Sequence, residues 1–348
     1  MDTNIDEILS LGIKKKTSDV HFSSDQAPWI RIDGALQRME TAPIPHHELY
    51  KVLLDCMPED MRVKFEEEKE SDFIYRLPDK TRFRVNLFQQ DSGIAAAFRV
   101  IPASIPSLDS LNMPASLKDL ALLPRGLVLV TGPTGAGKST TLASVIDYIN
   151  ETQHKHIVTI EDPIEFIHPN KNCLINQREV HHHTKSFNIA LRSALREDPN
   201  IILIGEMRDL ETIRLALTAA ETGHLVFATL HTLSAIKSIA RIIDVFPGEE
   251  RALVRTMLSG TLQGVVSQGL VPKINGGRVA ATEIMICNTA IRNLIREDKL
   301  AQAYSVIQTG SINGMHTLDQ HLQHLVSQKI IELATAKLLA HDKDSLVK

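Results

Sequence analysis

The chain has 348 residues, a formal net charge of −4, and 43% hydrophobic against 23% charged residues. This length favours two domains, and the composition is typical of a soluble globular protein. The slightly negative charge gives no general attraction to nucleic acid or anionic membranes. No run approaches the ~18 consecutive apolar residues of a membrane-spanning helix, and the acidic first residues contain no signal-peptide core. The dispersed cysteines Cys56, Cys173 and Cys287 lack metal-ligand spacing and are odd in number, which favours a reducing cytoplasm.

Residues 1–100 predict a small α/β domain. The dipeptide Asp33-Gly34 indicates a hairpin turn. Helices are expected at 5–11 and 59–69, and strands around 20–22, 29–32, 71–75, 82–89 and 94–100. Along the strand at 82–89, Phe83 and Val85 alternate with Arg82 and Arg84, which puts the arginines on the opposite face.

A linker is expected at 101–116, because residues 101–107 combine prolines with serines. From about Leu117 strands and helices alternate, which predicts a parallel sheet covered by helices. After about Ala280 the pattern becomes mainly helical to residue 348.

A complete phosphate-binding P-loop occupies residues 132–140. An apolar, β-branched run precedes it at 126–131 and a helical pattern follows it, so the motif lies between a strand and a helix, as its chemistry requires. Glycines let the backbone N–H groups face an anion, and the helix N-terminus adds positive charge. Lys138 can reach the β- and γ-phosphates, and Ser139 can bind Mg²⁺. The predicted nucleotide-binding residues are Gly132, Pro133, Thr134, Gly135, Ala136, Gly137, Lys138, Ser139 and Thr140.

Two further strands end in acids that can serve the bound nucleotide. The run 157–165 ends with Glu161, Asp162 and Glu165, and the run 201–206 ends with Glu206. Ligands of open α/β sheets bind at this carboxyl edge. Each acid alone is equally consistent with a solvated strand end, but their combination with a P-loop favours catalysis.

Histidines flank a third apolar strand. His231 follows it at the expected ligand edge and can sense the γ-phosphate, whereas a structural role is equally consistent with its chemistry; His224 precedes it. The run His181-His182-His183 suggests a metal cluster, but neighbouring side chains on an extended chain point to opposite faces. A solvated polar loop is therefore preferred.

These segments together resemble the hexameric ATPases of the secretion superfamily, and specifically the PilT-type retraction ATPases of type IV pili, over essentially the whole chain. The matching segments are the Walker A segment at 132–140, the Asp box at 159–166, the Walker B segment at 201–208 and the His box at 222–232. The segment Ala290–Glu297 resembles a signature of the retraction ATPases. From its residues alone it is an amphipathic helix with Ala290, Ile291, Leu294 and Ile295 on one face and Arg292, Arg296 and Glu297 on the other.

The resemblance implies a RecA-like P-loop ATPase domain at 117–348 with C-terminal helices, preceded by a PAS-like α/β domain. It implies a homo-hexamer that hydrolyses ATP with Mg²⁺ to power pilus retraction and twitching motility. The implied location is the cytoplasm, at the inner face of the bacterial inner membrane. The implied partners are an inner-membrane platform protein and a second retraction ATPase; no nucleic acid is expected.

The resemblance also implies residue roles. Glu206 is the first choice for the base, and Glu165 is the second choice, for positioning the water or the metal. Ser139 and Glu206 serve Mg²⁺, and His224 and His231 report the nucleotide state. Arg84 and Arg99 are expected to act as arginine fingers, with Arg82 less strongly indicated.

Other functions fit parts of the sequence. A type II/IV secretion ATPase or an accessory retraction ATPase shares most motifs, although the segment Ala290–Glu297 favours retraction. Pilus assembly motors usually carry a four-cysteine zinc motif, for which three dispersed cysteines do not suffice. A nucleotide-gated module without turnover fits less well, because both Glu165 and Glu206 are present. A nucleic-acid translocase is disfavoured by the charge and by the low aromatic content of 4%.

Overall fold

The computed structural model describes residues 4–101 and 104–347, in two compact units that divide between Ser104 and Ile105. This division lies inside the expected linker at 101–116, of which residues 102 and 103 are outside the described residues, as are 1–3 and 348. Leu108 and Met113 are buried in the core of the second unit, which therefore includes residues ahead of Leu117. Within 4–101 and 104–347, no helix is long and apolar enough to cross a membrane.

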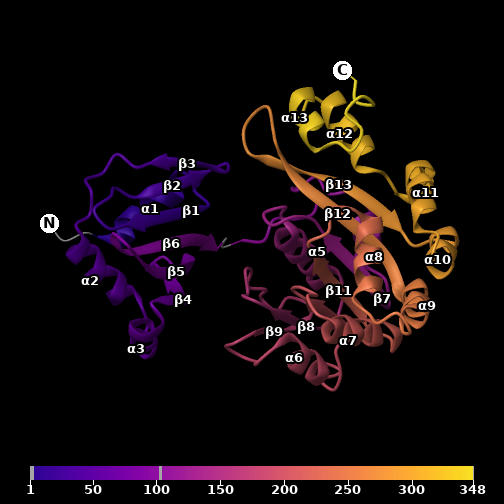
Figure 1. Ribbon diagram of the computed structural model, residues 1–348, viewed down its shortest axis with the longest axis horizontal. Helices are drawn as coiled ribbons and strands as arrows, with labels where there is room; N and C mark the ends of the chain where they lie inside the picture. Colours follow the sequence, from indigo (N-terminus) through magenta and orange to yellow (C-terminus); the bar gives the residue numbers. More distant parts are fainter. Residues whose placement is uncertain (1–3, 102–103, 348) are drawn as a thin grey trace. The chain divides into compact units, whose positions relative to one another are not determined.

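The N-terminal unit is built on a six-stranded antiparallel sheet in the order β3-β2-β1-β6-β5-β4 (Figure 1). Asp33 and Gly34 have positive φ angles of 48° and 90° and form the turn between β2 and β3, as their sequence predicts. The strands are β1 (Asp19–Ser23), β2 (Trp29–Ile32), β3 (Ala35–Arg38), β4 (Glu70–Arg76), β5 (Arg82–Gln90) and β6 (Gly93–Ile101).

Helices cover one face of this sheet. They are α1 (Ile5–Lys14), α2 (His46–Cys56) and α3 (Glu59–Glu68). Phe83, Val85 and Leu87 of β5 are fully buried in the core that these helices share with the sheet. The alternating residues Arg82 and Arg84 are half-buried on the opposite face, so the predicted two-residue periodicity is confirmed.

The C-terminal unit contains a seven-stranded sheet in the order β13-β12-β7-β11-β10-β8-β9. All neighbours pair in parallel except β12 and β13. The expectation of a mainly helical chain from Ala280 is wrong by several residues, because a buried apolar run has no periodicity that separates strand from helix. The strands are β7 (Gly126–Thr131), β8 (His156–Glu161), β9 (Leu174–Glu179), β10 (Ile201–Ile204), β11 (Leu225–Leu230), β12 (Leu262–Pro272) and β13 (Arg278–Ile286).

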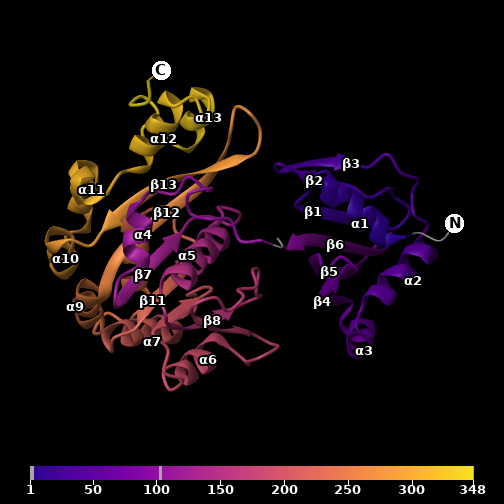
Figure 2. The ribbon, with the colours of Figure 1, turned by 180° about the vertical axis from the view of Figure 1, so that it is seen from behind.

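Helices cover both faces of the second sheet. Along β7, Leu127 and Leu129 face one core and Val128 and Val130 face the other. The first core is closed by α6 (Phe187–Ala194), α7 (Leu210–Glu221), α8 (Ala235–Asp244) and α9 (Arg251–Thr261). The second is closed by α4 (Ser116–Ala121) and α5 (Lys138–Thr152), which Figure 2 shows from behind.

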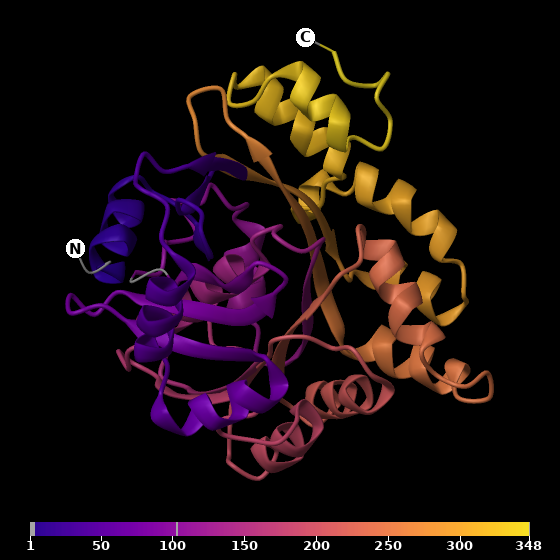
Figure 3. The same cartoon turned by 60° about the vertical axis from the view of Figure 1, so that its left-hand side comes forward.

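The chain ends in helices beside β12 and β13, where the yellow segment meets the orange strands in Figure 3. Val271 of β12 and Val279 and Ala281 of β13 share a core with α12 and α13. The C-terminal helices are α10 (Thr289–Arg296), α11 (Ala303–Thr309), α12 (Leu318–Ser327) and α13 (Leu333–Leu339), with single 3₁₀ turns at Leu300–Gln302 and Ser311–Asn313.

Thr282 of β13 ties α12 to the sheet through two histidines. Its hydroxyl lies 2.9 Å from His316 Nε2 and 2.8 Å from His321 Nδ1, and its backbone N–H donates to His321 Nδ1 at 2.9 Å. Burial lowers the pKa of each ring to about 4, and the neighbouring histidines act in the same direction. Both rings are therefore neutral at pH 7.

We expect this contact to make stability depend on pH. The folded pKa values lie below the ordinary 6.5, so the contribution is complete above pH 6.5 and is lost as the pH falls toward 4. At pH 5, each ring then lowers the free energy of unfolding by about 2 kcal/mol. In His321→Asn, Oδ1 still accepts from Thr282 but does not titrate. Urea unfolding at pH 7 and pH 5 should show a smaller loss for this variant. Equal losses in variant and wild type would contradict the assignment.

Candidate functional site

The P-loop joins the buried strand β7 to α5 and has the predicted backbone. Gly132, Gly135 and Gly137 have φ angles of 144°, 78° and 85°. These are conformations that side-chain-bearing residues rarely adopt. A Cβ on Gly132 would also lie 2.2 Å from the carbonyl oxygen of Gln268. The loop is therefore a cradle of bare backbone at the N-terminus of a helix, which suits an anion.

Lys138, the first residue of α5, lies against this cradle. Its amine donates to the carbonyl oxygens of Gly132 at 2.8 Å and Pro133 at 3.1 Å. Burial lowers the pKa of Lys138, while the charges of Glu206 and Glu165 raise it. The structure thus brings the P-loop cation within electrostatic reach of both predicted acids. Ser139 is exposed on the next position of the helix.

Glu206 follows β10 and is held between an arginine and a histidine. Its Oε1 lies 3.1 Å from His231 Nε2, and its Oε2 lies 2.7 Å from Arg208 Nη2. Burial raises the pKa of Glu206, but the hydrogen bond from Arg208 and the charge of His231 outweigh it, so the net pKa lies below its usual value. Glu206 is ionised at neutral pH. Arg208 was not among the predicted site residues, although it lies in the Walker B segment.

In the Asp box, Glu161 is half-buried, whereas Glu165 is exposed. Glu161 ends β8 and accepts hydrogen bonds from Thr159 at 2.6 Å and Gln177 at 3.1 Å. Burial raises the pKa of Glu161 to about 7, and its hydrogen bonds oppose that rise. The backbone N–H of Glu165 also bonds to this carboxylate. Glu161 therefore anchors the loop from which the exposed Glu165 extends.

The two histidines of the His box lie at opposite ends of β11. His231 follows the strand and reaches Glu206. His224 precedes the strand, where its Nδ1 lies 3.0 Å from the carbonyl oxygen of Ala219. Because β7, β10 and β11 are parallel, only His231 is at the edge that carries Lys138 and Glu206. Within one subunit, the structure does not bring His224 to that edge.

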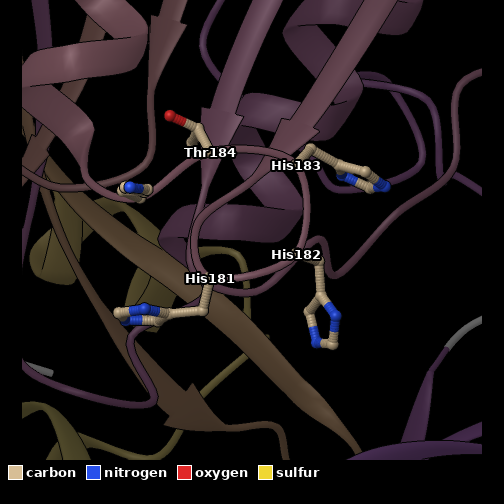
Figure 4. A pocket seen from close by; sticks show the side chains of 5 residues that line it. His181, His182, His183 and Thr184 are labelled. Atoms are coloured by element: carbon tan, nitrogen blue, oxygen red, sulfur yellow. The ribbon is translucent and has the colours of Figure 1, made fainter.

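The three consecutive histidines line a shallow pocket of about 380 Å³ with Thr184 and Lys185 (Figure 4). Their rings point in different directions in that view. His182 and His183 both contact Glu179, through its carboxylate at 3.3 Å and its backbone N–H at 2.9 Å. No group of three or more potential metal ligands converges among the described residues.

The predicted arginine fingers lie on the polar face of the N-terminal sheet. Arg84 and Arg99 are directly opposite each other on β5 and β6. Arg99 Nε pairs with Asp19 at 2.8 Å, and Arg84 Nε lies 3.6 Å from the exposed Asp72. Each of the two guanidinium groups therefore already has a carboxylate partner within the N-terminal sheet.

The segment Ala290–Glu297 forms α10, but its faces differ in part from the prediction. Ile291 and Ile295 are fully buried and Leu294 is half-buried, as expected, whereas Ala290 is exposed. Arg292 is not on a solvated face. Its guanidinium donates to the carbonyl oxygens of Ser259 at 2.7 Å and Gly260 at 3.1 Å, at the end of α9. A helix C-terminus attracts cations, which the periodicity of α10 alone does not reveal.

The arrangement fits a nucleotide phosphate with Mg²⁺. The glycine cradle has no room for a Cβ at Gly132, and the helix N-terminus and Lys138 supply positive charge. The hydroxyl of Ser139 and the carboxylate of Glu206 are hard oxygen donors of the kind that Mg²⁺ prefers.

Comparison with known proteins identifies the family of this chain. A family model described as "Type II/IV secretion system protein" matches residues 1–346. The type IV pilus retraction ATPase PilT of Pseudomonas aeruginosa is 57% identical, over 96% of this chain and 97% of the relative. A twitching motility protein of Neisseria gonorrhoeae is 53% identical over 92% and 86%, respectively.

A crystal structure of the pilus retraction motor PilT with bound ADP superposes with a TM-score of 0.90, at 48% identity and with 99% of each chain covered. That agreement confirms the expected α/β fold. The chain therefore belongs to the type II/IV secretion system protein family and, within it, is a homologue of the PilT-type pilus retraction ATPases.

Proposed function

We propose that this chain is a motor subunit that hydrolyses ATP to power type IV pilus retraction. The observation that carries the proposal is the convergence of Lys138, Glu206 and His231 at the carboxyl ends of β7, β10 and β11. Identity above 50% to two retraction proteins, over nearly the whole chain, favours retraction over secretion.

The P-loop amides and Lys138 bind the phosphates in this proposal. Glu206 is ionised, which is the state that accepts a proton. The attacking water gives its proton to Glu206 as its oxygen bonds to the γ-phosphorus. The bond from that phosphorus to the bridging oxygen then breaks and leaves ADP and phosphate. Mg²⁺, held by Ser139 and Glu206, would neutralise phosphate charge. Glu165 is the second candidate for positioning the water.

His231 and Arg208 tie Glu206 to its surroundings. Arg208 and His231 bind the same carboxylate. In this proposal, a change in the partners of Glu206 on phosphate binding therefore also moves His231. We therefore propose His231 as the residue that reports the nucleotide state. His224 is a weaker candidate, since it lies at the other end of β11.

The assembly is proposed to be a homo-hexamer at the cytoplasmic face of the bacterial inner membrane. Its partners would be an inner-membrane platform protein and a second retraction ATPase. These assignments rest on the family to which the chain belongs. Within the chain, α10 follows β13, and β13 pairs with β12. On its other side β12 pairs with β7, the strand that leads into the P-loop.

Glu206→Gln should separate binding from hydrolysis. The amide keeps the size of the side chain but cannot accept the proton, so turnover should fall by roughly two orders of magnitude or more while ATP still binds. ATPase assays and nucleotide titrations measure both, and cells with this variant should carry pili that do not retract. Glu221→Gln, an exposed acid at the end of α7, is the matched control. Normal turnover by folded Glu206→Gln would transfer the base role to another acid.

Arg84 and Arg99 are proposed as arginine fingers, with Arg82 less strongly supported. Arg84→Ala is the cleaner test, because its partner Asp72 is exposed and tolerates the loss of an ion pair. Hydrolysis should fall by about 10³-fold while ADP affinity is retained. Stopped-flow or steady-state ATPase assays give the rate. Arg38→Ala, an exposed arginine on the edge strand β3, should have no effect. Full-rate hydrolysis by both Arg84→Ala and Arg99→Ala would overturn the assignment.

A further inference from the structure

Gln268 contacts the P-loop from its first glycine to the first turn of α5. Its strand, β12, is paired with β7 up to the Ser267–Thr131 register position, so Gln268 lies where β7 gives way to the loop. Its backbone carbonyl oxygen lies so close to Gly132 that a Cβ there would be 2.2 Å away. The residue is only 4% exposed.

Both ends of the Gln268 amide bond to the loop and its helix. Nε2 donates to the carbonyl oxygen of Ala136 at 2.6 Å, and Oε1 accepts from the hydroxyl of Thr141 at 2.9 Å. A carbonyl oxygen can only accept, so the nitrogen of the amide must face Ala136. Nε2 also lies 3.3 Å from the place where a Cβ on Gly137 would be, so Gly137 and Gln268 fit closely.

We propose that Gln268 is a positioning residue that orients the P-loop amides toward the nucleotide phosphates. The Ala136–Gly137 peptide is trans, so its N–H points opposite to its carbonyl group. Because Gln268 holds the Ala136 carbonyl toward β12, the N–H of Gly137 is turned away from β12 and toward the interior of the loop. The hydrogen bond from Thr141 holds the first turn of α5 against the same Gln268 side chain.

This proposal rests on the proposed role of the P-loop in binding phosphate. It adds that the geometry of the loop is set by a residue of β12 that lies 127 residues after Thr141 in the sequence. Without the amide, the glycine-rich loop retains its freedom of rotation, and binding must then order it. The loss should therefore appear in affinity more than in the chemical step.

The test compares two substitutions of Gln268 in the full chain. Gln268→Met keeps the shape but removes both hydrogen bonds. The affinity for a fluorescent ADP should fall about tenfold, equivalent to about 1.4 kcal/mol, and the KM for ATP should rise more than kcat falls. The melting temperature without nucleotide should fall by only a few degrees, because Ala136 and Thr141 lose one hydrogen-bond partner each. Gln263→Met on the same strand is the control, because Gln263 bonds to Arg125 and Arg292 and not to the P-loop.

Gln268→Glu provides a readout that a purely structural role would not change. The ionised carboxylate still accepts from Thr141 but repels the Ala136 carbonyl oxygen, so ADP affinity should fall further than in Gln268→Met. Protonation restores a donor of the same shape. Affinity relative to wild type should therefore recover as the pH falls from about 8 to about 6, since burial raises the pKa of a carboxyl group.

The outcomes separate this proposal from the one on which it rests. ADP affinity within about twofold of wild type in folded Gln268→Met, with Lys138→Ala unable to bind, overturns the role of Gln268 alone. A lower melting temperature with unchanged affinity, or no recovery of Gln268→Glu at low pH, also overturns it. Normal binding by Lys138→Ala would overturn the P-loop assignment itself.

Discussion

Four neighbouring strands of the C-terminal unit, β7, β11, β10 and β8, pair in parallel, so that all of them end at the same edge of the sheet. Each strand is buried on both faces and cannot slip without moving an apolar side chain out of its core. The register therefore fixes the positions of Lys138, His231, Glu206 and Glu161 at this edge. The other features of the site within the C-terminal unit depend on this shared edge.

Charge at that edge is balanced in pairs. Lys138 is desolvated but lies within reach of two acids, and Glu206 is desolvated but held by Arg208 and His231. The balance keeps both groups ionised in a partly buried place, which is costly for an unpaired charge. Triphosphate brings further negative charge, and its arrival must redistribute these pairs. In the proposed mechanism, this redistribution links nucleotide binding to the positions of β10 and β11.

Local features of this protein could be predicted from sequence. The P-loop, the strands that end in acids and the alternation of β5 depend on a few consecutive residues. Contacts between segments that are distant in the sequence could not be predicted. Gln268 is 127 residues from Thr141, and Arg292 is 33 residues from Ser259. Periodicity placed Arg292 on the face opposite the apolar residues because it describes one helix, whereas the carbonyl groups that bind Arg292 belong to another. The extent of β13 was missed because its residues are buried on both faces, so its sequence shows no alternation of apolar and polar residues.

Hydrogen exchange of the full chain with and without ADP and Mg²⁺ tests the central claim most directly, because it reports each segment of backbone separately. If the shared edge binds the phosphates, protection should increase in residues 132–141 and, to a smaller extent, in 205–208 and 230–232. The opposite edge of the same sheet, around His224 and Gly126, should be unchanged. Protection confined to segments outside the shared edge, or none at 132–141 under saturating ADP, would contradict it.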